Sequence, residues 1–250
     1  LHSLIENSSE IIGVFYTAEE SSYIDNGLNI IMPILLSDFN IDFAIILEPT
    51  DNEIQLGCLG ALNATLTING KAAHSARPWV GDNPIYKVKD IVKLVEDNEI
   101  SEIEIDGLNF KQVMSITKIS SGIANNVIPE TLKLNLNFRY SPELNGSEAG
   151  SYINDLFFDY AEVEILNTSD GAMPNKSEEK ISEFIKKTGS VVQPKQAWTD
   201  IARFFEHKIP CVNFGPGDPL LAHATNEHVS KKQLLESYEL LSGYLGVKSE

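Results

Sequence analysis

Residues 132–140 read L-K-L-N-L-N-F-R-Y, with an apolar side chain at every second position. Side chains two apart in a β-strand point to the same face of the sheet, so this pattern predicts a strand that is buried on one face only. Residues 61–69 (A-L-N-A-T-L-T-I-N) and 113–119 alternate in the same way. Half-exposed strands of this kind are typical of an antiparallel sheet.

Two helices and a fourth strand accompany these three strands. Residues 84–96 and 146–158 are expected to be helical, and residues 161–166 form a further apolar run of strand length. Two helices on a four-stranded antiparallel sheet predict an α+β insert that spans about residues 59–170.

Short apolar strands alternate with helices on both sides of this insert. A β-α-β order favours a parallel sheet with helices on both faces. The sequence therefore predicts an α/β domain, made of residues 1–58 and 171–250 and interrupted by the insert. Its expected strands are residues 10–17, 41–47 and 209–214, and its expected helices are residues 26–36, 180–187 and 231–246.

The totals exclude several classes of function. A net charge of −17 argues against nucleic acid as a partner, because phosphate binding needs a basic surface. No apolar stretch reaches 18 residues, so neither a membrane span nor a membrane partner is expected. The two cysteines, Cys58 and Cys211, are too few for a disulfide framework and are expected to be buried thiols in a cytoplasmic protein.

Acidic residues follow the first two expected strands of the α/β domain. Glu19 and Glu20 come after residues 10–17, and Glu48 comes after residues 41–47. Ligands of open α/β sheets bind at the carboxyl ends of the strands. One glutamate can hold a metal while its neighbour acts as general base on a water molecule. A solvated turn is the alternative interpretation.

Histidine and asparagine supply weaker signals. His223 follows a strand and the loop G-P-G-D-P, which suits a metal ligand. His74 lies in G-K-A-A-H-S-A-R-P and Asn126 in a paired-Asn turn, and either can be structural only. The remaining histidines, which we interpret as surface or satisfied residues, are His2, His207 and His228.

Taken in order, the segments T-A-E-E, L-E-P-T, G-K-A-A-H-S-A-R-P, S-G-I-A-N-N-V-I-P-E, F-R-Y and G-P-G-D with A-H resemble the M20-type metallopeptidase family. Within it, G-D-N-P-I, W-T-D-I-A-R-F and V-N-F-G-P-G-D-P-L-L-A-H look most like the actinobacterial succinyl-diaminopimelate desuccinylases. The likeness runs from residue 1 to about residue 245.

The resemblance implies a dinuclear zinc amidohydrolase, with cobalt as a possible substitute, that removes succinate from N-succinyl-LL-2,6-diaminopimelate in lysine biosynthesis. Glu19 would be the general base, Glu20 and His223 would hold one metal, and Glu48 would hold the other. The insert would be a lid and dimerisation domain, and its His74 would reach into the partner subunit's active site in a homodimer. The implied substrate contacts are Asn126, Arg139, Thr199 and Arg203.

Two departures from the family pattern leave alternatives open. The family's His-x-Asp pair and bridging Asp are absent from the eighteen residues before Glu19. We expect an N-terminal portion to be missing and the chain by itself to be inactive, whereas a non-catalytic binding homologue is the alternative. Cys58 and Leu59 stand where many proteobacterial desuccinylases carry Arg. Another M20 N-acyl-amino-acid deacylase or carboxypeptidase is therefore the second alternative.

Overall fold

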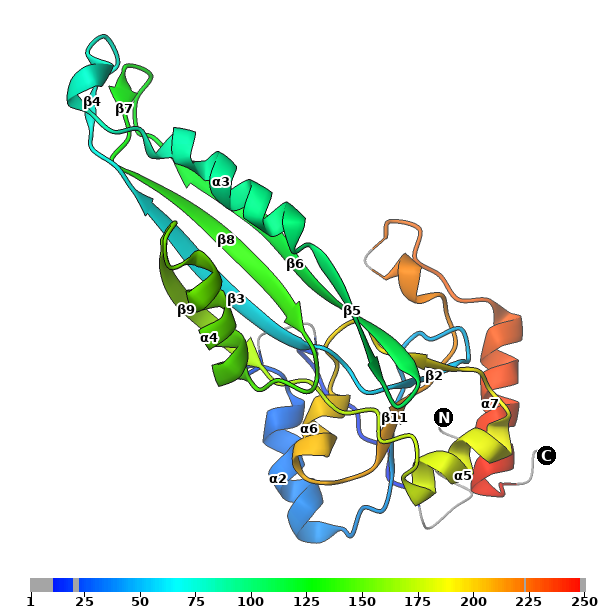
Figure 1. Ribbon diagram of the computed structural model, residues 1–250. Coiled ribbons are helices and arrows are strands. Elements are labelled where there is room, and N and C mark those ends of the chain that lie inside the picture. Colours follow the sequence, from blue (N-terminus) through cyan, green and yellow to red (C-terminus); the bar gives the residue numbers. More distant parts are fainter. Residues whose placement is uncertain (1–10, 20–22, 223, 248–250) are drawn as a thin grey trace. The chain divides into compact units, whose positions relative to one another are not determined.

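The structure is a computed structural model that describes residues 11–19, 23–222 and 224–247. The chain divides into two compact units (Figure 1). The insert unit comprises Leu59–Gly171 with Gln196–Trp198. The described residues before, between and after these segments make up the outer unit.

A five-stranded antiparallel sheet forms the centre of the insert unit, in the order β5-β6-β8-β3-β9. The prediction of four strands was wrong by one, because it omitted β5, whose side chains are mostly exposed. The turn Asp106-Gly107 joins β5 to β6 with positive φ at both residues, which is the geometry of a tight hairpin. The strands are β3 (Gly60–Asn69), β5 (Ile100–Ile105), β6 (Leu108–Ser121), β8 (Thr131–Tyr140) and β9 (Glu162–Ser169).

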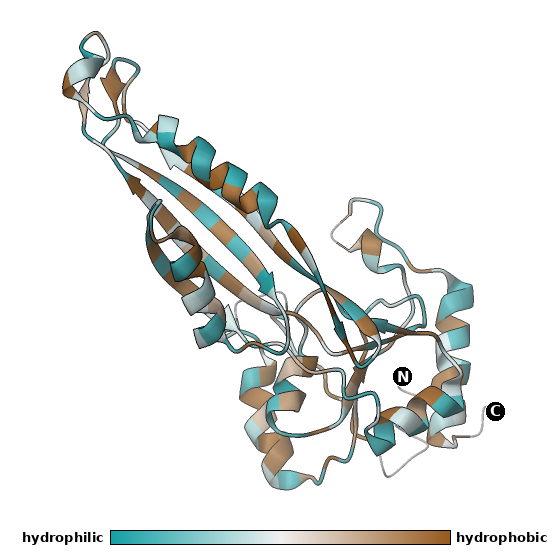
Figure 2. Ribbon diagram, in the orientation of Figure 1, coloured by the Kyte–Doolittle hydropathy of each residue, from teal (hydrophilic) through white to brown (hydrophobic). Residues whose placement is uncertain are grey.

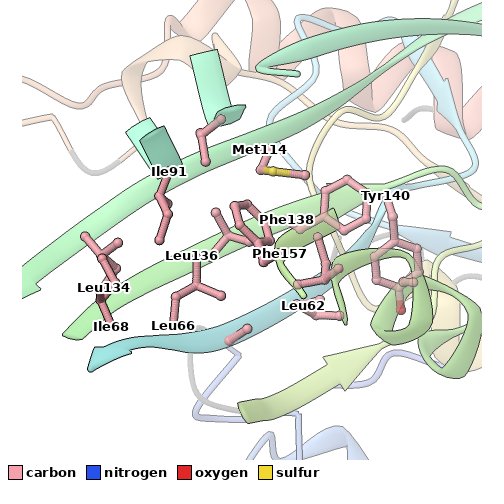
Figure 3. Packing of buried hydrophobic residues seen from close by; sticks show 14 of the residues in the cluster. Leu62, Leu66, Ile68, Ile91, Met114, Leu134, Leu136, Phe138, Tyr140 and Phe157 are labelled. Atoms are coloured by element: carbon pink, nitrogen blue, oxygen red, sulfur yellow. The ribbon is translucent and has the colours of Figure 1, made fainter. Parts of the chain in front are cut away.

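One face of this sheet is covered by α3 (Pro84–Asp97) and α4 (Gly146–Phe157). Buried and half-exposed residues alternate along β3 and β8, and the hydropathy along β8 alternates accordingly (Figure 2). Ile91 of α3 and Phe157 of α4 pack into one cluster with Leu66 and Leu136 of the strands (Figure 3). The alternation in the sequence therefore places the core between the sheet and these two helices.

A second, two-stranded sheet lies beyond the end of the main sheet in the insert unit (Figure 1). It pairs β4 (Ala73–His74) with β7 (Val127–Ile128), and His74 is opposite Val127. The short helix η1 (Pro78–Val80) follows β4. We call this part of the insert unit the tip.

The outer unit contains a four-stranded sheet in the order β1-β11-β2-β10. β1 pairs with β11 and β2 pairs with β10 in parallel, whereas β2 and β11 are antiparallel through Gln55 and Asn213. The sheet is thus rich in parallel pairs. Its strands are β1 (Ala44–Ile46), β2 (Ile54–Leu56), β10 (Val192–Pro194) and β11 (Cys211–Asn213).

The strand expected at residues 10–17 does not form within the described residues 11–17. A strand needs a neighbour that donates and accepts its backbone hydrogen bonds, and the described part of the chain supplies none there. Phe15 and Ile12 are accordingly 74% and 44% exposed. The apolar run was a valid signal for strand propensity, but pairing decides whether a strand forms.

Helices contact the outer sheet from both sides. On one side, the Sγ of Cys211 in β11 lies 3.3 Å from the carbonyl oxygen of Ile201 in α6. On the other, Phe214 packs edge-on against Phe184 of α5. No helix within residues 11–19, 23–222 and 224–247 is long and apolar enough to cross a membrane. The described helices of this unit are α2 (Leu28–Asp38), α5 (Glu179–Thr188), α6 (Ile201–Glu206), the short 3₁₀ helix η2 (Pro219–Leu221) and α7 (Lys231–Leu245).

Candidate active site

Glu19 lies in a loop of the outer unit whose ends are joined by hydrogen bonds. The N–H of Gly27 donates to the carbonyl oxygen of Thr17 at 3.0 Å, and Asn26 Nδ2 donates to the carbonyl oxygen of Glu19 at 3.3 Å. Ala18, directly before Glu19, has φ of 60°, which is unfavourable for a residue with a Cβ. We call the described residues of this segment, Thr17–Glu19 and Tyr23–Gly27, the Glu19 loop. Residues 20–22 lie outside the described structure, so the expected metal ligand Glu20 is not placed.

The buried carboxylate of Asp200 connects this loop to α6. It accepts hydrogen bonds from the hydroxyl of Tyr16 at 2.6 Å and from Asn26 Nδ2 at 3.1 Å. Arg203 Nε donates to the same carboxylate at 2.7 Å. Sequence reasoning missed Asp200, although it stands inside the W-T-D-I-A-R-F segment, because its partners are remote in the chain.

Arg203, an expected substrate contact, is only 2% exposed and makes several internal contacts. Besides Asp200, it donates through Nη2 to the carbonyl oxygen of Tyr23 at 2.7 Å and through Nη1 to Asn29 Oδ1. Its guanidinium also lies 3.9 Å from the centre of the Tyr23 ring. The guanidinium is thus bonded to the loop and to α2, and its contact with substrate stays a prediction.

Thr199, also expected to contact substrate, lies in the interior of the outer unit. Its hydroxyl donates to Asn213 Oδ1 at 3.0 Å, and Asn213 Nδ2 donates to the carbonyl oxygen of Gln55 at 3.3 Å. The Sγ of Cys58 approaches the carbonyl oxygen of Thr199 at 4.0 Å. Thr199 therefore links the start of α6 to the strands β2 and β11.

Glu48 follows β1, as expected, and pairs with a lysine that sequence reasoning missed. Lys195 Nζ lies 3.2 Å from Glu48 Oε2, and the two side chains are 8% and 20% exposed. Removing two charges from water is costly unless they compensate each other, so this pair fixes the position of the Glu48 carboxylate. Lys195 follows β10, so only the folded sheet brings it to Glu48.

The electrostatics of Tyr16 show that several carboxylates share one neighbourhood. Burial raises the pKa of Tyr16, and the hydrogen bond to Asp200 raises it further. The negative charges of Glu19 and Glu48 add to this increase. Carboxylate oxygens are among the ligands that a divalent metal such as zinc takes in proteins.

The complete metal site cannot be assembled from the described residues. Among them, no three His, Cys, Asp or Glu side chains cluster closely enough to hold a metal ion. Two of the three expected ligands, Glu20 and His223, lie outside the described residues. Glu48 is the expected ligand whose surroundings are known.

The tip of the insert unit brings His74 and Asn126 together. The N–H of Ala76 donates to His74 Nδ1 at 3.0 Å, so the neutral imidazole carries its proton on Nε2. The carbonyl oxygen of Asn126 accepts the N–H of Ser75 at 2.9 Å. His74 and Asn126 are both exposed. The tip thus carries both an exposed imidazole and an exposed amide side chain.

Arg139 lies at the opposite end of the same unit. Its Nε donates to Asn137 Oδ1 at 3.2 Å on the half-exposed face of the sheet. Arg139 is eight residues beyond Thr131, where β8 begins near the tip. At about 3.3 Å per strand residue, this separation is roughly 26 Å. One insert unit therefore cannot bring His74 and its own Arg139 to one small substrate.

Comparisons with known proteins agree on one family. The family described as the peptidase dimerisation domain of M20 proteins matches residues 56–162. The putative succinyl-diaminopimelate desuccinylase DapE of Mycobacterium tuberculosis is 36% identical over 246 residues, which are 98% of this chain and 69% of that protein. The succinyl-diaminopimelate desuccinylase of Corynebacterium glutamicum is 35% identical over 93% of this chain and 64% of its own length.

Solved structures share the fold. A metallo-carboxypeptidase of the M20 family from Sulfolobus solfataricus superposes with a TM-score of 0.65 at 15% identity, over 88% of this chain and 67% of that one. At this identity the likeness shows the fold alone. Because the Mycobacterium protein is more than 30% identical over nearly all of the present sequence, the chain belongs to the M20 peptidase family.

Proposed function

We propose that the protein is a zinc-dependent amide hydrolase that removes succinate from N-succinyl-LL-2,6-diaminopimelate in the cytoplasm, for lysine and diaminopimelate biosynthesis. The observation that carries this proposal is the 36% identity, over 98% of the chain, to a putative desuccinylase. The carboxylates of Glu19 and Glu48 support it, because both are close enough to Tyr16 for their charges to raise its pKa.

Glu19 is the proposed general base. It takes a proton from the attacking water as the new C–O bond forms at the succinyl carbonyl carbon. When the amide C–N bond breaks, Glu19 returns the proton to the leaving nitrogen, and succinate and diaminopimelate are released. The proposed metal ligands are Glu20, Glu48 and His223, and zinc would supply Lewis acidity and lower the pKa of the water.

The insert unit is the proposed lid and dimerisation domain, here assigned to residues 59–170, with the catalytic domain as residues 1–58 and 171–250. His74 is proposed to act in the partner subunit's site, because it lies in the tip, whereas Arg139 of the same chain is roughly 26 Å along β8 from Thr131, where that strand begins near the tip. With its proton on Nε2, the imidazole can donate to the oxyanion that develops on the amide carbonyl.

The substrate of the proposed reaction carries several carboxylates, which need donors. Arg139 supplies a cation on the half-exposed face of β8, and Asn126 supplies an amide at the tip. Thr199 and Arg203 complete the proposed set of contacts. Both side chains are buried, so a conformational change on substrate binding would have to expose them.

A second candidate function is deacylation of another N-acyl amino acid, or a carboxypeptidase activity. It is favoured by Cys58 and Leu59, which are 0% and 1% exposed and offer no cation to a substrate carboxylate. The difference between the candidates therefore concerns the acyl group, not the hydrolytic chemistry.

A substrate panel separates these candidates. Full-length protein with added zinc is assayed on N-succinyl-LL-2,6-diaminopimelate, N-acetyl amino acids and C-terminal glutamate dipeptides, with amine release as the measurement. We expect the highest kcat/KM for the succinyl substrate and loss of all activities in Glu19→Gln. A higher kcat/KM for an acetylated or dipeptide substrate would assign the second function instead.

A further inference from the structure

We infer that Asp200 is a positioning residue, whose carboxylate holds both ends of the Glu19 loop and thereby fixes where Glu19 lies. The inference rests on the proposed function for its consequence in catalysis. Whether the buried Asp200 carboxylate holds the loop in place can be tested without any assay of hydrolysis.

Asp200 contacts one residue before Glu19 in the sequence and one residue after it. Tyr16, three residues before Glu19, donates its hydroxyl to Asp200 at 2.6 Å. Asn26, seven residues after Glu19, donates Nδ2 to both carboxylate oxygens at 3.1 Å. Asn26 Nδ2 also donates to the carbonyl oxygen of Glu19 at 3.3 Å. A displacement of the Asp200 carboxylate would therefore move the Asn26 side chain and, with it, Glu19.

The geometry of α6 gives an independent indication. Asp200 stands at the N-cap of α6, where an aspartate ordinarily accepts a backbone N–H of the first turn. Here the side chain makes no such capping bond. Its oxygens instead accept from Arg203 within α6 and from Tyr16, which lies outside this helix.

Arg203 makes this arrangement possible. Asp200 and Arg203 are 0% and 2% exposed, and a buried carboxylate persists only with a compensating cation. The same guanidinium bonds the carbonyl oxygen of Tyr23 and the side chain of Asn29, which follow Glu19 in the chain. The ion pair therefore connects the loop to α6 through both Asp200 and Arg203.

The backbone of the loop needs such support. Ala18 has φ of 60°, a conformation that persists only where surrounding contacts hold it. Asp200 holds the residues on either side through Tyr16 and Asn26. The unfavourable conformation beside the proposed base is therefore maintained by the carboxylate.

The competing view is that Asp200 itself contacts the substrate. The two views predict different kinetics. Loss of a substrate contact raises KM, whereas misplacement of the base lowers kcat and leaves KM unchanged. A shift of about 1 Å in a reacting group can reduce the rate by roughly 10²-fold.

Tyr16→Phe is the decisive variant, because it removes one donor from Asp200 and leaves no charge unpaired. Tyr23→Phe is its matched control, since it removes a hydroxyl of the same loop that bonds the exposed carboxylate of Glu206 and keeps the ring over Arg203. Both are made in the full-length zinc-loaded protein. Asp200→Asn is a third variant, which also unpairs Arg203 and is used only if it folds.

Two readouts are taken on each variant. In Tyr16→Phe we expect kcat to fall about tenfold or more with KM within about twofold of wild type. We also expect faster hydrogen exchange at the amides of Gly27 and Leu28, whose bonds to Thr17 and Asn26 close the loop, and unchanged exchange in β8. Tyr23→Phe should match wild type in both.

Two outcomes would overturn the inference. In the first, Tyr16→Phe leaves both kcat and the exchange of the loop amides like those of Tyr23→Phe. In the second, KM rises with kcat unchanged, which assigns this region to substrate binding. If the wild-type protein hydrolyses no succinyl substrate, the proposed function fails, and hydrogen exchange still decides whether Asp200 holds the loop.

Discussion

Gly27 is the residue at which the Glu19 loop closes, and a side chain does not fit there. A Cβ at this position would lie 2.5 Å from the backbone oxygen of Thr17, which cannot rotate away. We expect Gly27→Ala to lower the free energy of unfolding by about 1–3 kcal/mol, as overpacking does elsewhere. Urea denaturation followed by circular dichroism measures this change.

Gly243 in α7 is the matched control for this substitution. No atom lies within 4 Å of a Cβ built there, so Gly243→Ala should stabilise the helix by about 0.5–1 kcal/mol. If both substitutions shift the free energy of unfolding in the same direction, close approach at Gly27 is not what requires the glycine.

The thiol of Cys58 makes stability depend on pH. Burial raises its pKa to about 11 from an ordinary value of 9. The folded state therefore holds this proton more tightly than the unfolded state, and the resulting stability is present below pH 9 and lost as the pH rises toward 11. We expect a loss of about 2 kcal/mol from this group across that range.

Comparison of wild type with Cys58→Ala isolates this contribution. Cys211, whose pKa is also raised by burial, and the tyrosines contribute in both proteins. Urea denaturation at pH 8, 9, 10 and 11 should give a steeper decline for wild type. Parallel declines would show that Cys58 ionises equally in the folded and unfolded chains.

At this scale, the sequence predicts candidate site residues but not the partners that they contact. Glu19 and Glu48 were predicted as site residues because each follows a run of apolar residues. Lys195 and Asp200 were not, because each partner is remote in the chain: Glu48 is 147 residues from Lys195, and Tyr16 is 184 residues from Asp200. Such pairings depend on the tertiary fold, which local patterns do not encode.

Among the elements, the hairpin of β5 and β6 depends on its turn. Gly107 has φ of 72°, and a Cβ there would meet no atom within 4 Å. Gly107→Ala therefore tests backbone conformation without any steric contact. We expect it to lower the free energy of unfolding by about 1 kcal/mol, measured by urea denaturation.

Gly107→Asn is the control for the hairpin, since asparagine tolerates positive φ better than alanine. It should destabilise the protein less than Gly107→Ala. An equal loss in both variants would mean that the turn does not require its left-handed conformation.

The elements with clear periodicity could be predicted, and those held by pairing alone could not. β3 and β8 alternate over ten residues each, so their buried faces were evident. β2 and β10 have three residues each, too few for a period to be recognised. Residues 11–17 are the reverse, because their composition is typical of a strand but no strand of the described residues pairs with them.

For the whole molecule, the proposed dimer makes each active site dependent on two chains. If His74 acts across the interface, a Glu19→Gln chain and a His74→Ala chain should restore each other's activity. A mixed dimer holds one site with an intact Glu19 and an intact His74 of the partner subunit. After random exchange of subunits, activity should return to about a quarter of the wild-type value.

The measurement is hydrolysis by full-length zinc-loaded chains, before and after mixing. Each variant alone should be reduced strongly, by roughly 10²–10³-fold for the loss of one oxyanion donor. Chains carrying different affinity tags show whether subunits exchange. Exchange without any return of activity would place His74 within its own chain's site or outside catalysis.

The backbone contact between Cys58 and Ala172 has a consequence for how the protein can be rebuilt. Their N–H and carbonyl groups exchange two hydrogen bonds, at 2.9 and 3.0 Å, directly at the two ends of residues 59–171. A two-residue turn such as Asn-Gly can join positions bonded in this way. Residues 59–171 can therefore be exchanged for another domain that is joined at these two positions, and the hydrogen bonds between Cys58 and Ala172 can be kept.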